Sequence, residues 1–140
     1  MDYMPDFMEA KYHLAVAKRM LVTYDEYPEK RVLVGVIREG AKASSRLIRS
    51  FLIVSGVKGG VDVFSRLVAN RYLDEAISEN LVKILEVERA QRSSPVEFTR
   101  NGKIILLIDG KYRILTVERI REFVNSIELG VERFPTNIKR

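Results

Sequence analysis

The chain has 140 residues, of which 46% are hydrophobic and 31% are charged, and its formal net charge is +5 at pH 7. These totals exclude a disordered chain and predict one globular domain that covers residues 1–140. The sequence has no cysteine and one histidine, which excludes disulfides, zinc fingers, thiol chemistry and a histidine-based metal cluster within one chain. We therefore expect neither a metal nor a cofactor.

The same sequence predicts a cytoplasmic protein that does not bind membranes. No apolar run approaches the roughly 18 residues that a membrane span needs, and no basic region precedes an apolar stretch at the N-terminus. Many Glu, Lys and Arg residues occur with a single Gln, a composition that leans toward a heat-adapted source. The basic balance allows an anionic partner such as RNA, DNA or a nucleotide.

The first two predicted elements are helices. Apolar residues spaced by three and four predict a helix over residues 6–24, with Asp6 as its N-cap. Its stripe is formed by Phe7, Ala10, Leu14, Ala17, Leu21 and Tyr24. A longer helix is predicted over residues 28–55, with Pro28 in its first turn and small residues near Gly40 that permit close helix packing. Because the link 25–27 is short, the two helices should be antiparallel neighbours.

Two further helices are expected before residue 95. The glycine loop 56–60 ends the long helix, and Asp62 can cap a third helix whose inner face is formed by Val63, Phe64, Leu67, Val68 and Tyr72. A fourth apolar series follows at Leu73, Ile77, Leu81, Ile84 and Val87. The candidate caps Asp74 and Ser78 predict a break between these helices within residues 70–78. The bundle should thus span residues 6–94.

Residues 96–115 change to the two-residue period of strands. Asn101-Gly102 and Asp109-Gly110 are favoured pairs for two-residue hairpin turns, so they predict a three-stranded antiparallel meander. Two such turns would align Phe98 with Ile105 and Ile114, and Val96 with Leu107 and Tyr112. That alignment makes one face wholly apolar. On the other face Ile104, Leu106 and Leu115 are candidates for covering either the bundle or a second subunit.

The last predicted element is a helix over residues 117–134. Thr116 can cap it, and its apolar stripe continues to Phe134, just before Pro135. Gly130 either ends this helix early or is tolerated inside it. The expected fold is therefore mainly α: an antiparallel four-helix-type bundle with a small β-meander and a C-terminal helix.

A basic stripe on the long helix is the strongest candidate site. Five cations share one face of this helix: Arg31, Arg38, Lys42, Arg46 and Arg49. Arginine suits phosphate recognition because its fork binds two oxygens at once. Three interpretations stay open, namely a solvated face, a surface for nucleic acid or another anion, and pairing with acids of another subunit. Arg89 and Arg92 form a second basic group at the end of the fourth helix.

Two weaker candidates for chemistry remain. His13 is the sole histidine, and Glu9, four residues earlier, could share its face and orient it as a general base. The loop 56–60 contains Lys58 among its glycines, but it lacks the Lys-Ser/Thr end and the preceding strand of a phosphate-binding loop.

The helical layout resembles the HEPN superfamily of antiparallel helical bundles. The features that carry the resemblance are the alanines Ala10, Ala15 and Ala17 in the first helix, the end of the long helix in Phe51 to Val57, and the arginines that close the fourth helix. It covers roughly residues 6–94, and residues 116–134 match a trailing helix. The meander is a departure from this family and a candidate docking surface.

The resemblance implies a dimer and one of three roles. Many HEPN proteins are metal-independent RNases of toxin–antitoxin systems, some pair with small nucleotidyltransferases, and others are non-catalytic. The RNase version needs an Arg followed four to six residues later by His. Arg89 can take the Arg position, but Ser94 stands five residues on and no histidine follows His13. The resemblance therefore implies a member without the catalytic pair.

Three hypotheses of function follow. The first is a non-catalytic, dimeric interaction module that binds a partner protein, such as a small nucleotidyltransferase, or a nucleotide-bearing ligand. The second is an RNA- or DNA-binding protein that uses the basic stripe, with affinity that falls steeply with salt. The third is an enzyme, either with His13 as base or as a divergent RNase.

Overall fold

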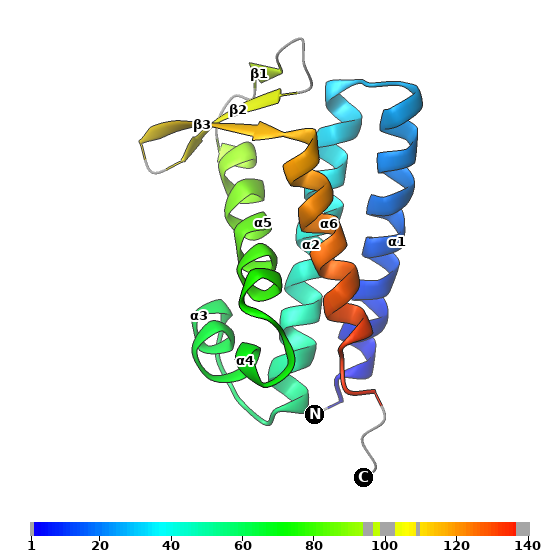
Figure 1. Cartoon of the computed structure of the whole chain (residues 1–140). Coiled ribbons are helices and arrows are strands. Elements are labelled where there is room, and N and C mark those ends of the chain that lie inside the picture. Colours follow the sequence, from blue (N-terminus) through cyan, green and yellow to red (C-terminus); the bar gives the residue numbers. More distant parts are fainter. Residues whose placement is uncertain (1, 94–96, 99–102, 109, 137–140) are drawn as a thin grey trace.

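Four long helices form the body of the protein. The computed structural model describes residues 2–93, 97–98, 103–108 and 110–136. The long helices are α1 (Met4–Glu26), α2 (Lys30–Val54), α5 (Glu75–Ser93) and α6 (Val117–Glu132). Figure 1 shows them side by side, with a small sheet at one end of the bundle. The short helices between α2 and α5 lie at the opposite end, together with the start of α1 and the end of α6.

The first two helices form the predicted antiparallel pair, with small differences at their ends. All six residues of the predicted α1 stripe are buried. However, α1 begins at Met4, because Pro5 is tolerated in a first turn whose N–H groups have no helical partner. Asp6 is therefore not an N-cap but lies inside the helix, with its side chain turned to α2. Likewise Pro28 precedes α2, whose N-cap is Glu29.

The segment between α2 and α5 is helical but irregular. It consists of α3 (Val61–Val63), the π-helical turn η1 (Phe64–Val68) and α4 (Ala69–Tyr72), and it breaks before Glu75 as predicted. Phe64 and Val68 are buried, whereas Leu67, which was expected on the inner face, is 46% exposed. A π turn has more residues than an α turn, so the apolar spacing of an α-helix no longer applies there.

Small residues let α2 approach both α5 and α6. A Cβ atom added to Gly40 would lie 2.7 Å from Ile84 Cδ1 of α5, and one added to Gly130 would lie 2.8 Å from Leu47 Cδ2 of α2. The buried Ser44 hydroxyl donates to the Leu81 carbonyl at 2.6 Å. Gly130 is thus tolerated inside α6, since the helix continues to Glu132. The Thr116 side chain caps α6 by accepting from the Arg119 backbone N–H at 3.1 Å, as predicted.

Most of the sheet is one β-hairpin. Strands β2 (Lys103–Ile108) and β3 (Lys111–Thr116) pair over six residues in the predicted register, with Ile105 opposite Ile114. Only two residues of the expected first strand are described, as β1 (Glu97–Phe98). Val96, Asn101-Gly102 and Asp109 lie outside the described residues. The structure therefore confirms the hairpin, and the full three-stranded meander stays a prediction.

The alignment of β1 differs from the predicted one. Phe98 pairs with Ile104 and Glu97 with Ile105, a shift of one residue from the expected pairing of Phe98 with Ile105. A strand of two residues forms few cross-strand pairs, so little holds its register against a slip of this size.

The hairpin face that covers the bundle is the less apolar of the two. Ile104, Leu106 and Leu115 are 0%, 1% and 7% exposed, so they take the first of their two predicted alternatives and cover the bundle. Because β3 runs directly into α6, whose first residue Val117 is also buried, Leu115 must turn toward the core. Strand alternation then places Ile114 on the opposite face.

Candidate functional site

Two arginines of α2 converge on one carboxylate of α1. Arg46 Nη1 donates to Asp6 Oδ1 at 2.8 Å, and Arg49 Nε donates to Asp6 Oδ2 at 3.0 Å. Arg46 Nε also lies 3.1 Å from Glu9 Oε2. The Asp6 side chain is 12% exposed, whereas those of Arg46 and Arg49 are 46% and 58% exposed. Asp6 therefore orients both guanidinium groups from the protein side, while the groups themselves reach solvent.

His13 is oriented by α2 and not by its own helix. Its Nδ1 lies 3.1 Å from Glu39 Oε1, and Lys42 Nζ lies 3.4 Å from Glu39 Oε2. An ionised carboxylate only accepts, so Nδ1 donates. The expected partner Glu9 pairs with Arg46 instead, because the face that Glu9 shares with His13 turns toward the cations of α2. A carboxylate that orients a histidine also occurs in general-base sites, so catalysis by His13 stays a prediction.

A groove of about 610 Å³ lies beside these ion pairs. It brings three cations of the basic stripe together with His13 and with part of the glycine loop, which sequence reasoning had treated separately. Its lining residues are His13, Lys42, Ser45, Arg46, Ile48, Arg49, Leu52, Gly59, Gly60 and Val61. We call this the cationic groove. The described residues that line the cationic groove include no acid, so the acids that pair with its cations lie outside its wall.

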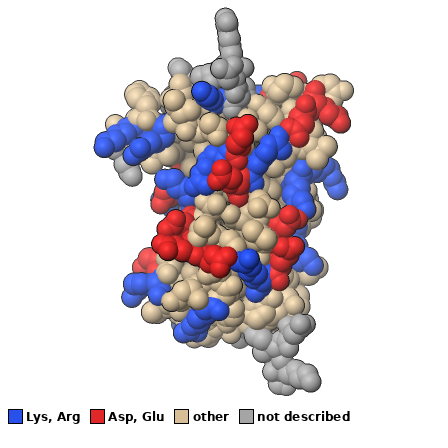
Figure 2. Space-filling model, viewed as in Figure 1, with Lys and Arg blue, Asp and Glu red and all other residues tan. Residues whose placement is uncertain are grey.

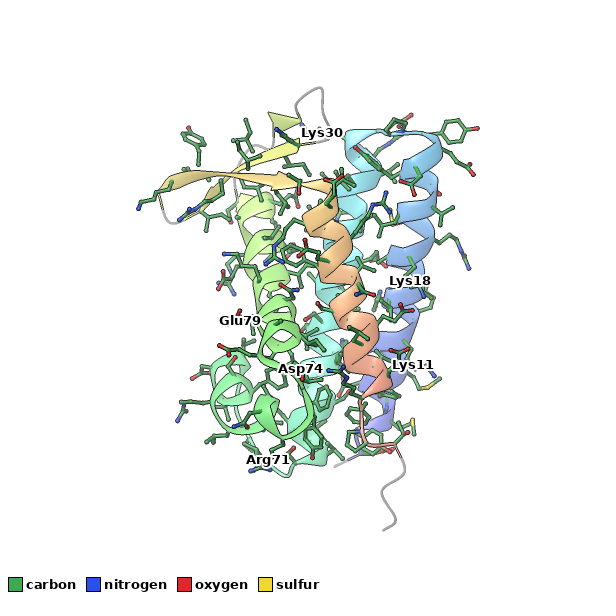
Figure 3. The ribbon with its side chains drawn as sticks, viewed as in Figure 1. Lys11, Lys18, Lys30, Arg71, Asp74 and Glu79 are labelled. Carbon is green, nitrogen blue, oxygen red and sulfur yellow. The ribbon has the colours of Figure 1, made fainter. Side chains whose placement is uncertain are left out.

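The other predicted cations lie away from the cationic groove. Arg31, beside Lys30 at the hairpin end of α2 (Figure 3), pairs with Glu29 at 3.3 Å. Arg38 is exposed and has no ion pair within the part of the chain that the structure describes. Arg92 pairs with Glu88 on its own helix at 3.4 Å, and Arg89 is exposed nearby. The seven predicted cations therefore do not form one continuous surface.

Charges elsewhere are mixed in sign. The face with α6 in front carries interspersed Lys, Arg, Asp and Glu side chains (Figure 2). Some of these charged side chains form ion pairs that join different parts of the chain: Lys18, labelled in Figure 3, pairs with Glu128, and Arg133 pairs with Asp74 at 2.8 Å. Another cation, Arg121, lies near the Tyr24 phenol, whose pKa burial raises above its usual value and Arg121 lowers. The described residues of this face therefore form no patch of a single sign.

The outer face of the hairpin is the second candidate surface. Leu107, Tyr112 and Ile114 are 39%, 78% and 65% exposed, and Ile105 between them is half-buried. These four side chains lie on one face of two paired strands, so they form a contiguous apolar patch. We call these four residues the hairpin patch. Sequence analysis identified this face as wholly apolar, and the structure leaves it exposed.

The contacts between α1 and α2 could have been found from the sequence. In two antiparallel helices joined by a short link, residues at equal distances from the link come together. His13 and Glu39 are symmetric about Glu26, and so are Asp6 and Arg46. The missed signal was therefore this symmetry about the predicted link.

Comparison with known proteins assigns no family. No family model, no curated protein and no solved structure matches the chain. Among the described residues, no helix is long and apolar enough to cross a membrane, and no group of three or more His, Asp or Glu residues could hold a metal ion. Function must therefore be argued from the cationic groove and the hairpin patch.

Replacing Asp6 by asparagine should lower the free energy of unfolding by about 1–2 kcal/mol, a value discounted for the exposure of both arginines. The variant keeps the shape of the side chain but leaves two guanidinium groups without their shared negative charge. Urea denaturation at low salt measures the loss, which should shrink at 1 M NaCl because salt screens ion pairs. The matched control Glu9→Gln, at a carboxylate that is 51% exposed, should cost less than about 0.5 kcal/mol. Equal losses in the two variants would contradict the central role of Asp6.

Proposed function

We propose that this protein is a non-catalytic helical interaction module that forms a dimer through the hairpin patch. The observation that carries the proposal is the exposure of Tyr112 and Ile114, at 78% and 65%, on a regular paired sheet face. A sheet face whose side chains are this apolar gains free energy when a second protein surface excludes water from it.

The size of the hairpin patch indicates a weak dimer. The exposed parts of its large side chains amount to roughly 350 Å² of surface, within the range of the largest apolar patches on monomers. A standard stable interface buries about 800 Å² on each partner. Two copies that join by this patch alone should therefore associate with a dissociation constant in the micromolar range or weaker.

The alternatives have less support. Four of the five cations of the basic stripe pair with acids of the same chain, which reduces the charge available to a long nucleic acid. The resemblance to HEPN proteins also predicts a helical bundle. Membership of that family is part of the proposal. A different partner protein, such as a small nucleotidyltransferase, could occupy the same hairpin patch. In that case the protein alone should stay monomeric in the experiment below.

The test is the average mass of the protein in solution, measured by light scattering or sedimentation from about 10 μM to 1 mM, a range that brackets weak association. The wild-type mass should rise with concentration toward that of a dimer. The double variant Tyr112→Ser/Ile114→Thr should stay monomeric, since it removes apolar surface while threonine retains a high strand propensity.

The matched control removes a tyrosine and a β-branched apolar side chain elsewhere. Tyr27 and Val22 are 65% and 60% exposed and lie outside the hairpin, so Tyr27→Ser/Val22→Thr should dimerise like the wild type. Salt should not weaken an apolar dimer, whereas it would weaken association through the basic stripe. A wild-type protein that is monomeric throughout, or a dimer that the hairpin variant retains, would contradict the proposal. Adding a short RNA at low salt tests the nucleic-acid alternative in the same instrument.

A further inference from the structure

We propose that the cationic groove binds a small organic phosphomonoester. The groove volume of about 610 Å³ lies within the range of small-molecule sites. Among the described residues, the polar side chains that line the groove are those of His13, Lys42, Ser45, Arg46 and Arg49. Those of Lys42, Ser45, Arg46 and Arg49 can donate hydrogen bonds to a ligand. A ligand that accepts from several donors and carries negative charge is therefore the chemistry that this wall recognises.

The ion pairs of the arginines prepare the groove for such a ligand. The contacts with Asp6 and Glu9 engage Nε and Nη1 of Arg46, and that with Asp6 engages Nε of Arg49. A guanidinium has five N–H donors, so donors of both groups remain for a phosphate. Since Asp6 already holds both side chains, a ligand would order few rotatable bonds on binding, which favours affinity.

The body of the ligand is indicated by a second hollow beside the first. It has a volume of about 410 Å³, shares Arg49, Leu52 and Gly59 with the cationic groove, and is otherwise lined by Ile53, Gly56, Val57 and Lys58. Arg49 thus stands between a cationic hollow and a more apolar one. A phosphate bound at Arg46 and Arg49 would place an attached apolar or aromatic group against Leu52, Ile53 and Val57. This arrangement favours a phosphomonoester over inorganic phosphate.

The test uses phenyl phosphate and inorganic phosphate as probes, titrated into the full chain by calorimetry in a phosphate-free buffer at low salt. Phenyl phosphate should bind saturably and more tightly than inorganic phosphate. Arg49→Gln should weaken it by about tenfold or more, the loss expected for charge-assisted hydrogen bonds. Arg31→Gln is the matched control, because Arg31 is on the same helix, 89% exposed and outside the groove, and should leave the affinity unchanged.

A second variant keeps the proposal testable if Arg49→Gln lowers stability. Ser45 is exposed on α2, and Glu has the higher helix propensity, so Ser45→Glu should preserve the fold while placing a negative charge in the groove. It should abolish binding of phenyl phosphate. Absence of saturable binding, equal affinity for the two probes, or unchanged affinity in Ser45→Glu would overturn the proposal. So would a short RNA that binds more tightly than phenyl phosphate and loses affinity equally with Arg31→Gln and Arg49→Gln, since that pattern indicates a polyanion along the whole stripe.

Discussion

Replacing Phe51 by alanine should lower the free energy of unfolding by about 3–5 kcal/mol, the loss typical of a large aromatic side chain in a core. Phe51 is fully buried near the end of α2. Its ring centroid lies 6.0 Å from that of Phe64, 5.2 Å from that of Tyr72 and 5.0 Å from that of Phe134. One side chain thus joins α2 to the irregular segment 61–72 and to the chain beyond α6. Alanine would remove these contacts and leave a cavity among the remaining rings.

Urea denaturation followed by circular dichroism measures this loss. Typical domains are stable by only about 5–15 kcal/mol, so the milder variant Phe51→Leu, with an expected loss of about 1–2 kcal/mol, provides a readout if the alanine variant is largely unfolded. Tyr27→Ala, at a side chain that is 65% exposed, should change stability by less than about 0.5 kcal/mol. A loss below about 1 kcal/mol for Phe51→Ala would show that the aromatic cluster does not contribute to the core as described.

Two adjacent leucines of β2 allow the orientation of the hairpin to be tested with one type of substitution. Leu106 is 1% exposed and faces the bundle, whereas Leu107 is 39% exposed and belongs to the hairpin patch. Leu106→Ala should cost about 2–4 kcal/mol, because it leaves a cavity between the hairpin and the helices. Leu107→Ala should cost less than about 1 kcal/mol, because water already reaches that side chain.

Chemical denaturation at low protein concentration, where the proposed dimer dissociates, measures both variants under the same conditions. The order of the two losses decides the result, because both sites change Leu to Ala in one strand and differ in burial. If Leu107→Ala were the more destabilising, the more apolar face of the hairpin would be the buried one, as its sequence pattern alone suggests. The proposed hairpin patch would then be part of the core.

Much of the fold could be predicted because helices and turns depend on residues close together in the chain. The spacing from Phe7 to Tyr24 predicted the buried face of α1, and Thr116 predicted the start of α6. Asp109-Gly110 predicted the register of β2 and β3, since a two-residue turn leaves one alignment of the flanking strands. The helix ends were less accurate, because Pro5 and Pro28 are compatible with more than one starting position.

The site was less predictable because it consists of contacts between elements. The sequence identified the basic stripe, His13 and the glycine loop one by one, since each is visible in a short stretch. It did not show that Lys42, Arg46 and Arg49 line a groove with Gly59 and Gly60, because that depends on how the segment after α2 folds back. It also did not show that Asp6 and Glu9 of α1 pair with cations of the stripe, because that depends on how the two helices pack.

By itself, the sequence determined which residues share a face of each helix or strand, because 3.6-residue and two-residue periods follow from backbone geometry alone. Only the tertiary structure decided which faces meet. Ile104 and Leu106 are buried and Tyr112 and Ile114 are exposed because β3 continues without a loop into α6, whose buried start turns Leu115 inward. Hydrophobicity ranked the two faces in the opposite order, but the direction in which the chain enters the bundle outweighed it.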